Sequence, residues 1–108
     1  MSTRTRDWHA WINVTLPSQL YHLHVIGEAL VGNEGIEAFL TEKEPREMTP
    51  SALPLDLHKS QRRGQWQQRT TWVRVRYEKT LAAGQKHSAI DIFEGGTSIA
   101  HLKAETVT

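Results

Sequence analysis

The sequence predicts an all-β protein, a sandwich of about seven antiparallel strands. Apolar and polar residues alternate with a period of two through most of the chain, which is the pattern of half-buried strands. Short stretches rich in glycine, proline and asparagine separate the alternating segments, and turns are expected there. The chain has 108 residues, the usual size of one domain, so residues 1–108 are expected to fold as a single β domain.

Two strands are predicted in the N-terminal third of the chain. Residues 8–16 alternate between apolar and polar positions, and Pro17 ends this run. Residues 21–31 alternate again, with the apolar and small side chains mainly at odd-numbered positions. A tight connection is expected at residues 32–35, because glycine and asparagine tolerate the positive φ angles that turns require.

The segment of residues 36–43 has two interpretations. Alternation favours a strand, whereas the spacing of Ile36, Phe39 and Leu40, together with glutamate and alanine, favours a helix. A strand is preferred because both neighbouring segments are predicted strands. Residues 45–54 contain three prolines and are expected to form a loop.

A long hairpin is predicted in the second half of the chain. Residues 53–61 and 66–79 alternate, and residues 62–65 are expected to form the loop between them. The second strand is the clearest, because β-branched and aromatic residues dominate it. Its two faces carry Thr71, Val73, Val75 and Tyr77 on one side and Trp72, Arg74 and Arg76 on the other.

The last two strands are predicted at residues 89–93 and 98–105, after a turn at residues 83–86 and around the pair Gly95-Gly96. Seven such strands must pack as two sheets or close into a barrel. A sandwich of immunoglobulin or fibronectin type is the first expectation at this length, and a small β-barrel is the alternative. Parallel pairing is not expected, because no long helical crossover is available.

The composition favours a cytoplasmic protein. The chain has no cysteine, whereas secreted domains of this size often depend on disulfides. No apolar segment follows the charged N-terminal residues, so no signal peptide is expected. The most apolar stretch, residues 23–32, is too short and too polar to cross a membrane.

Charge is unevenly distributed, although the net charge is only +1. Residues 28–56 contain seven acidic residues, and residues 59–79 contain seven basic residues and a single acid. The candidate interaction residues of the basic segment are Trp66, Trp72, Arg74 and Arg76. Aromatic rings between guanidinium groups can stack on bases, so single-stranded nucleic-acid binding through the hairpin 59–79 is one alternative function. The near-neutral net charge weighs against it.

A second alternative is a metal site. His22, His24 and Glu28 lie on one face of their predicted strand, and imidazoles and carboxylates are ligands of divalent metals. With Gly35, their spacing resembles the first metal motif of the cupins, which are small β-barrels. The resemblance implies a metal-dependent enzyme that uses these three residues. Leu16 stands where that motif begins with glycine, and no second motif follows.

A protein contact is the preferred function. Trp11 and Trp72 lie on the polar sides of their predicted strands, and tryptophan is enriched at the energetic centres of protein interfaces. The sequence has no nucleophile elbow and no glycine-rich phosphate loop, so catalysis is not favoured. We expect a non-enzymatic module without a cofactor that binds a protein partner or a second copy of itself.

Overall fold

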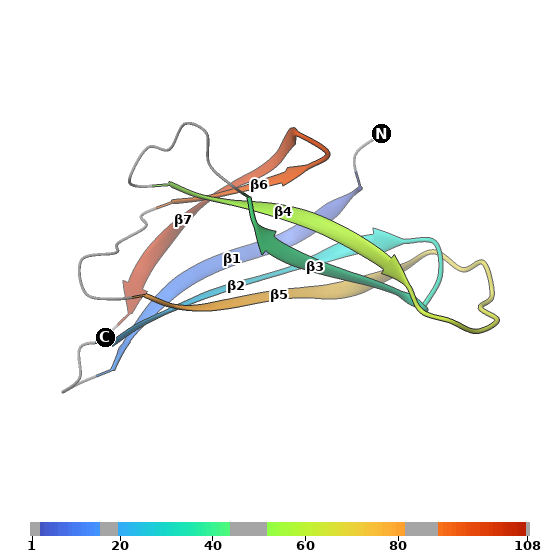
Figure 1. The fold of residues 1–108 in the computed structure, drawn as a ribbon, viewed down its shortest axis with the longest axis horizontal. Coiled ribbons are helices and arrows are strands. Elements are labelled where there is room, and N and C mark those ends of the chain that lie inside the picture. The colour runs from blue at the N-terminus through green and yellow to red at the C-terminus, as the bar shows by residue number, and fades with distance from the viewer. Residues whose placement is uncertain (1–2, 16–19, 44–51, 82–88, 108) are drawn as a thin grey trace.

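The structure is a computed structural model that describes residues 3–15, 20–43, 52–81 and 89–107. All regular structure in these residues is β-strand (Figure 1), and they include no helix that is long and apolar enough to cross a membrane. The seven strands are β1 (Thr5–Thr15), β2 (Leu20–Val31), β3 (Ile36–Glu42), β4 (Ala52–Gln61), β5 (Thr71–Leu81), β6 (Ala89–Glu94) and β7 (Thr97–Val107).

The strands form one sheet in the order β3-β4-β6-β7-β1-β2-β5. Strand β7 joins its two halves, because the part up to Lys103 pairs antiparallel with β6, whereas Ala104–Val107 pairs parallel with β1. The sheet curls, so that β3 and β4 lie across β1, β2 and β5 (Figure 1). The two halves thereby enclose one core between them.

The curled sheet is nearly closed where its two end strands, β3 and β5, approach each other. No backbone ladder joins these two strands, and the approach depends on side chains. Lys79 of β5 forms an ion pair with Glu42 of β3. The hydroxyl of Tyr77 lies close enough to the same carboxylate for its negative charge to disfavour ionisation of the phenol. We call this region the β3–β5 seam.

The core consists of the inward-facing positions that alternation selects. Alternate residues of β2, of β6 and of the first half of β4 are buried, and alternate residues of β5 are buried or half-buried, because successive side chains of a strand point to opposite faces. The largest fully buried side chains are Leu23, Val25, Leu55, Val75, Leu81, Ile90 and Ile92. Each stabilises the fold by about 1.5 to 3 kcal/mol relative to exposure.

The all-β class and the seven strands predicted from the sequence are confirmed. Residues 36–42 form a strand, as preferred, and the connection at residues 32–35 is a turn. The continuous, nearly closed sheet fits the small-barrel alternative. Gly95 and Gly96 form the hairpin between β6 and β7 with φ angles of 57° and 86°, as a two-residue turn requires. The turn predicted at residues 83–86 lies outside the described residues.

Three expectations were wrong. Parallel pairing does occur: β1 pairs parallel with β7, and β4 pairs parallel with β6. No helical crossover is needed, because other strands, such as β5 between β4 and β6, form the connections. Segment 59–79 is not a hairpin: β4 pairs with β3 and β6, β5 pairs with β2, and residues 62–70 link them as a loop. Of the loop predicted at residues 45–54, residues 45–51 lie outside the described residues, and residues 52–54 belong to β4 instead. The carbonyl of Pro54 accepts a hydrogen bond from the Lys43 amide at 3.0 Å.

Candidate functional site

The outer surface of β1, β2 and β5 brings together most of the residues that the sequence singled out. We call it the β1–β2–β5 face. Its cross-strand rows, each made of directly opposed residues on neighbouring strands, include Leu30 and Trp72; Glu28 and Arg74; His9, Ile26 and Arg76; Trp11, His24 and Glu78; and Asn13, His22 and Thr80. The even-numbered positions of β2 and β5 therefore form one continuous surface.

Aromatic rings on this face pack against cationic or heteroaromatic groups. The guanidinium carbon of Arg6 lies 3.9 Å from the ring centroid of Trp72. The indole of Trp11 stacks on the imidazole of His24, with centroids 5.1 Å apart and planes inclined by 19°. Both tryptophans are half-buried by these contacts. The two indole rings are thus held in place by neighbouring side chains, and such preorganisation lowers the entropic cost of binding.

A depression of about 340 Å³ lies in the middle of the face. Its lining includes Trp11, Ile26 and Gly27 together with the side chains of Arg74 and Arg76. The depression is open to solvent, and Asp7, His9 and Glu28 complete its lining, so it combines apolar side chains with groups of both charges. Such a surface suits another macromolecular surface better than a small molecule, which generally binds in an enclosed pocket.

Most charges on the face are paired within the chain. The Nε atom of Arg6 lies 3.2 Å from Glu28 Oε1, and the Nε atom of Arg76 lies 4.0 Å from Glu78 Oε1. Arg74 differs, because it has no ion pair among the described residues and is exposed to solvent. Its cross-strand neighbour Glu28 is paired with Arg6 instead.

Sequence reasoning missed Arg6, and a β-bulge explains why. Trp8 points toward the core, so alternation alone would place Arg6 on the inner side as well. The pairing of β1 with β2 shifts between Arg6 and His9, and Asp7 adopts a φ of 56° at this point. The extra residue turns Arg6 to the outer face, where it reaches Glu28 and Trp72. A bulge at a non-glycine residue leaves no signal in the polarity pattern.

The proposed metal ligands share a face but do not converge. His22 contacts the Thr80 hydroxyl at 3.4 Å, the Nδ1 atom of His24 lies 3.5 Å from Glu78, and Glu28 binds Arg6. Within the ranges that the structure describes, no three histidine, cysteine or acidic side chains are grouped so that they could hold a metal ion. The arrangement therefore gives the cupin-like alternative no geometric support.

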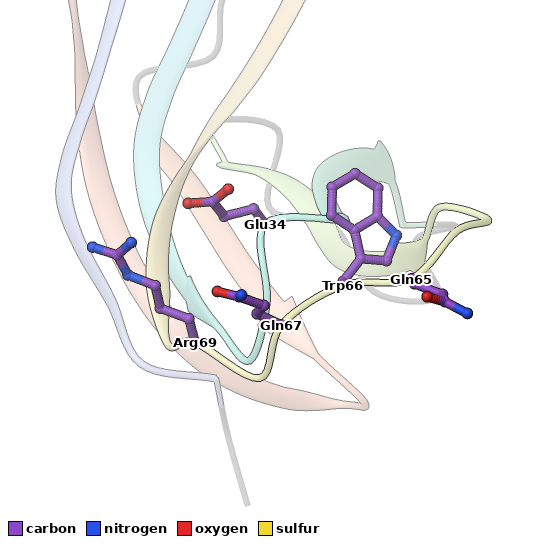
Figure 2. Close-up of a pocket in the computed structure, with 5 residues that line it drawn as sticks. All are labelled: Glu34, Gln65, Trp66, Gln67 and Arg69. Carbon is purple, nitrogen blue, oxygen red and sulfur yellow. The ribbon is translucent and has the colours of Figure 1, made fainter.

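Trp66 lies in the loop of residues 62–70 (Figure 2), whereas Trp72 lies on β5. Its indole Nε1 donates to the carbonyl of Arg62 at 3.1 Å, and its ring covers Gly35 so closely that a Cβ there would lie 2.3 Å from Cε2. It lines a separate depression of about 230 Å³ whose other lining residues are Glu34, Gln65, Gln67 and Arg69. The four predicted interaction residues therefore divide between two places.

Asn33 holds the chain beside this loop and is the buried polar residue of the described core. Its Oδ1 atom accepts hydrogen bonds from the Gly35 amide at 2.9 Å and from Gln61 Nε2 at 3.1 Å, and its Nδ2 donates to Gln61 Oε1 at 2.9 Å. These bonds join the turn after β2 to the end of β4. Asn33 acts as an anchor of the fold rather than as a binding residue.

The outer side of β3, β4, β6 and β7 carries other contacts of histidine side chains. His58 stacks on Phe39 with a centroid distance of 5.4 Å and accepts or donates a hydrogen bond of 2.7 Å with the Thr41 hydroxyl. His101 pairs with Asp91 across β6 and β7. These pairs are exposed side-chain contacts of neighbouring strands, as a solvated sheet surface produces.

Two groups outside the β1–β2–β5 face have shifted pKa values. Burial of Glu94 would raise its pKa, but hydrogen bonds from the amide and hydroxyl of Thr3 and the charge of Lys59 outweigh burial and hold the pKa below its usual value. Burial, followed by the charge of Glu42, raises the pKa of Tyr77 to about 12. The first group links the N-terminal segment to the end of β6, and the second lies at the β3–β5 seam.

Comparison with known protein families, with curated proteins and with solved structures finds no match for this chain. The fold and the site therefore define the class by themselves. The chain is a small all-β domain with a nearly closed sheet, a filled core and an outer face on which tryptophans lie among arginines.

Proposed function

We propose that this domain is a non-enzymatic interaction module that binds a protein partner through the β1–β2–β5 face. The observation that carries the proposal is the open depression that Trp11 and Ile26 line together with Arg74 and Arg76. Aromatic residues and arginine are enriched in the centres of protein interfaces, where they bury large areas and still form polar contacts.

The location of the apolar side chains supports a surface function. The side chains that point between the two halves of the sheet are buried or partly buried and constitute the core. In small barrels the side chains fill the interior and stabilise the fold, so no space is left there for a ligand. The outer surfaces are then the places where a partner is recognised.

Charge balance favours a protein over a nucleic acid. A nucleic-acid surface requires several guanidinium or ammonium groups that are free to neutralise phosphates. On this face Arg6 and Arg76 already lie beside Glu28 and Glu78, at 3.2 and 4.0 Å. Those carboxylates would repel a phosphate backbone, whereas a protein surface of mixed charge can accommodate them.

The experiment compares capture by the wild-type chain with capture by two variants. Immobilised wild type is expected to retain a defined protein from a cytoplasmic extract, the compartment that we propose from the absence of cysteine. Trp11→Ala should lose it, because this substitution removes the indole ring that lines the depression. His101→Ala is the matched control, since it removes a ring from the other outer surface.

Direct titration of the purified partner should give a dissociation constant at least tenfold weaker for Trp11→Ala than for His101→Ala. Equal binding by both variants would assign the contact to another surface. If the wild type binds neither an extract protein nor itself, the proposed function fails.

A further inference from the structure

We propose that the partner of the β1–β2–β5 face is a second copy of this chain, related by a two-fold axis that crosses β5 at Arg76. This inference rests on the proposed function and names its partner. It comes from the order of charges along β5, where Arg74 and Glu78 lie on the same face at equal distances from Arg76.

A two-fold axis at this position reverses the direction of the strands of the second copy and keeps β5 opposite β5. Arg74 then faces Glu78 of the other copy, and Glu78 faces the other Arg74. Cross-strand rows two residues apart are separated by about 7 Å along a strand, so both pairs fit within one contact. Arg74, the guanidinium without an ion pair among the described residues, gains one.

The centre of the face is compatible with the same axis. Ile26 is directly opposite Arg76 on the neighbouring strand, so the two Ile26 side chains would meet at the axis. The two Arg76 guanidinium groups would also meet there, each within reach of its own Glu78, whose Oε1 lies 4.0 Å away. This juxtaposition of like charges is the unfavourable element of the arrangement, and it provides a specific control.

The same axis also brings the two ends of the face together. Leu30 and Trp72 form the row at one end, and the axis places the row of His22 and Thr80 opposite them. The indole of Trp72 and the side chain of Leu30 would thus pack against the hydroxyl-bearing Thr80 and the imidazole of His22 of the other copy.

Face-to-face contact is favoured over edge-to-edge contact, because β3 approaches the edge of β5 at the β3–β5 seam and restricts access to it. Three strands of about eleven residues and the end of β7 present an area of roughly 19 by 36 Å, since neighbouring strands lie about 4.8 Å apart and each residue rises about 3.3 Å. Contact over this whole area would bury about 1,300 Å² in total, which is the upper limit for this curved face and lies at the lower end of the range for specific interfaces. We therefore expect a dimer of on the order of micromolar affinity.

The test is sedimentation equilibrium of the full chain over a wide range of concentrations. The weight-average mass should rise from the monomer mass of 12.3 kDa toward twice that value. Arg74→Glu and Glu78→Arg should each weaken the dimer at least tenfold, because each places like charges opposite each other. The double variant reverses both partners and should restore the dimer to within about threefold of wild type.

Arg76→Gln is the control against a general effect of charge. It removes the same charge as Arg74→Gln from the same strand, two residues away. In the proposed register, Arg74→Gln weakens the dimer, whereas Arg76→Gln dimerises at least as tightly as wild type because it removes the repulsion at the axis. Circular dichroism of each variant checks that the fold is retained.

The outcomes separate this inference from the proposed function. A wild-type chain that stays monomeric near millimolar concentration overturns the second copy as partner, while a different protein that Trp11→Ala fails to bind would still support the module. A dimer that the double charge reversal does not restore, or that Arg76→Gln weakens as much as Arg74→Gln, overturns the proposed axis. A monomer with no partner overturns both.

Discussion

Close packing of Trp8 against Gly27 makes the fold sensitive to the addition of a single methyl group. Gly27 is buried on β2, and a Cβ atom there would lie 2.3 Å from Cε3 and 2.6 Å from Cδ2 of Trp8. These distances are far below van der Waals contact. The indole cannot simply rotate away without loss, because its Nε1 donates a hydrogen bond of 2.9 Å to the Thr5 hydroxyl.

We therefore expect Gly27→Ala to destabilise the protein. Overpacking of this kind costs about 1 to 3 kcal/mol. The loss of glycine freedom in the unfolded chain offsets about 0.4 to 1 kcal/mol of that cost. The net decrease in the free energy of unfolding is then about 1 to 2 kcal/mol. With an unfolding entropy of about 0.23 kcal/mol/K for a chain of this length, the Tm should fall by roughly 4 to 9 °C.

Gly32→Ala is the matched control for this prediction. A Cβ at Gly32 would meet only Gln68 Oε1 at 3.9 Å, which is an ordinary contact, and Gly32 does not have a positive φ. Its Tm should equal or exceed that of wild type. Thermal and urea unfolding followed by circular dichroism measure both variants. If the two differ by less than about 0.5 kcal/mol, the close packing of Trp8 on β2 is refuted.

Two further predictions concern the shifted titratable groups. Glu94→Gln should lower the free energy of unfolding by about 1 to 2 kcal/mol at pH 7, because charge-assisted hydrogen bonds from Thr3 are lost. The pKa of Glu94 is lower in the folded chain, so its contribution to the free energy of unfolding is present above the unfolded pKa and disappears as the pH falls through the folded pKa. The stabilities of wild type and variant should therefore become equal in acid. A constant difference between their free energies of unfolding in urea across this pH range would contradict the assignment. In a Tyr21→Phe background, the phenolate absorbance of Tyr77 should appear near pH 12 rather than near pH 10. Glu42→Gln should lower the pH at which this absorbance appears, because it removes a neighbouring negative charge. Titration near pH 10 in the folded chain would exclude a partly buried Tyr77 at the β3–β5 seam.

The local pattern of polarity was sufficient to locate the strands and their buried faces. Val73, Val75 and Tyr77 point inward and Arg74 and Arg76 outward, as alternation predicts. This succeeds because the side chains of one strand alternate whatever the strand pairs with. The same reasoning correctly placed His22, His24 and Glu28 on one face, but it could not reveal the partner that each side chain would find.

The pairing of the strands was decided by contacts between distant segments. Residues 59–79 read as a hairpin because a loop between two alternating runs is the shortest way to pair them. In the structure β4 pairs with β3, and β5 pairs with β2, instead of β4 and β5 pairing with each other. Residues 62–70 therefore cross from one half of the sheet to the other. Trp66 and Trp72 are separated for this reason.

The sequence by itself determined that this chain forms seven amphipathic strands, because the period of a strand is a property of its own backbone. The tertiary structure alone decided the strand order, the two parallel pairs, the near closure through Glu42 and Lys79, and the bulge that turns Arg6 outward. These features depend on the free energy of interaction between side chains that are distant in the sequence. A local pattern of polarity contains no information about that free energy.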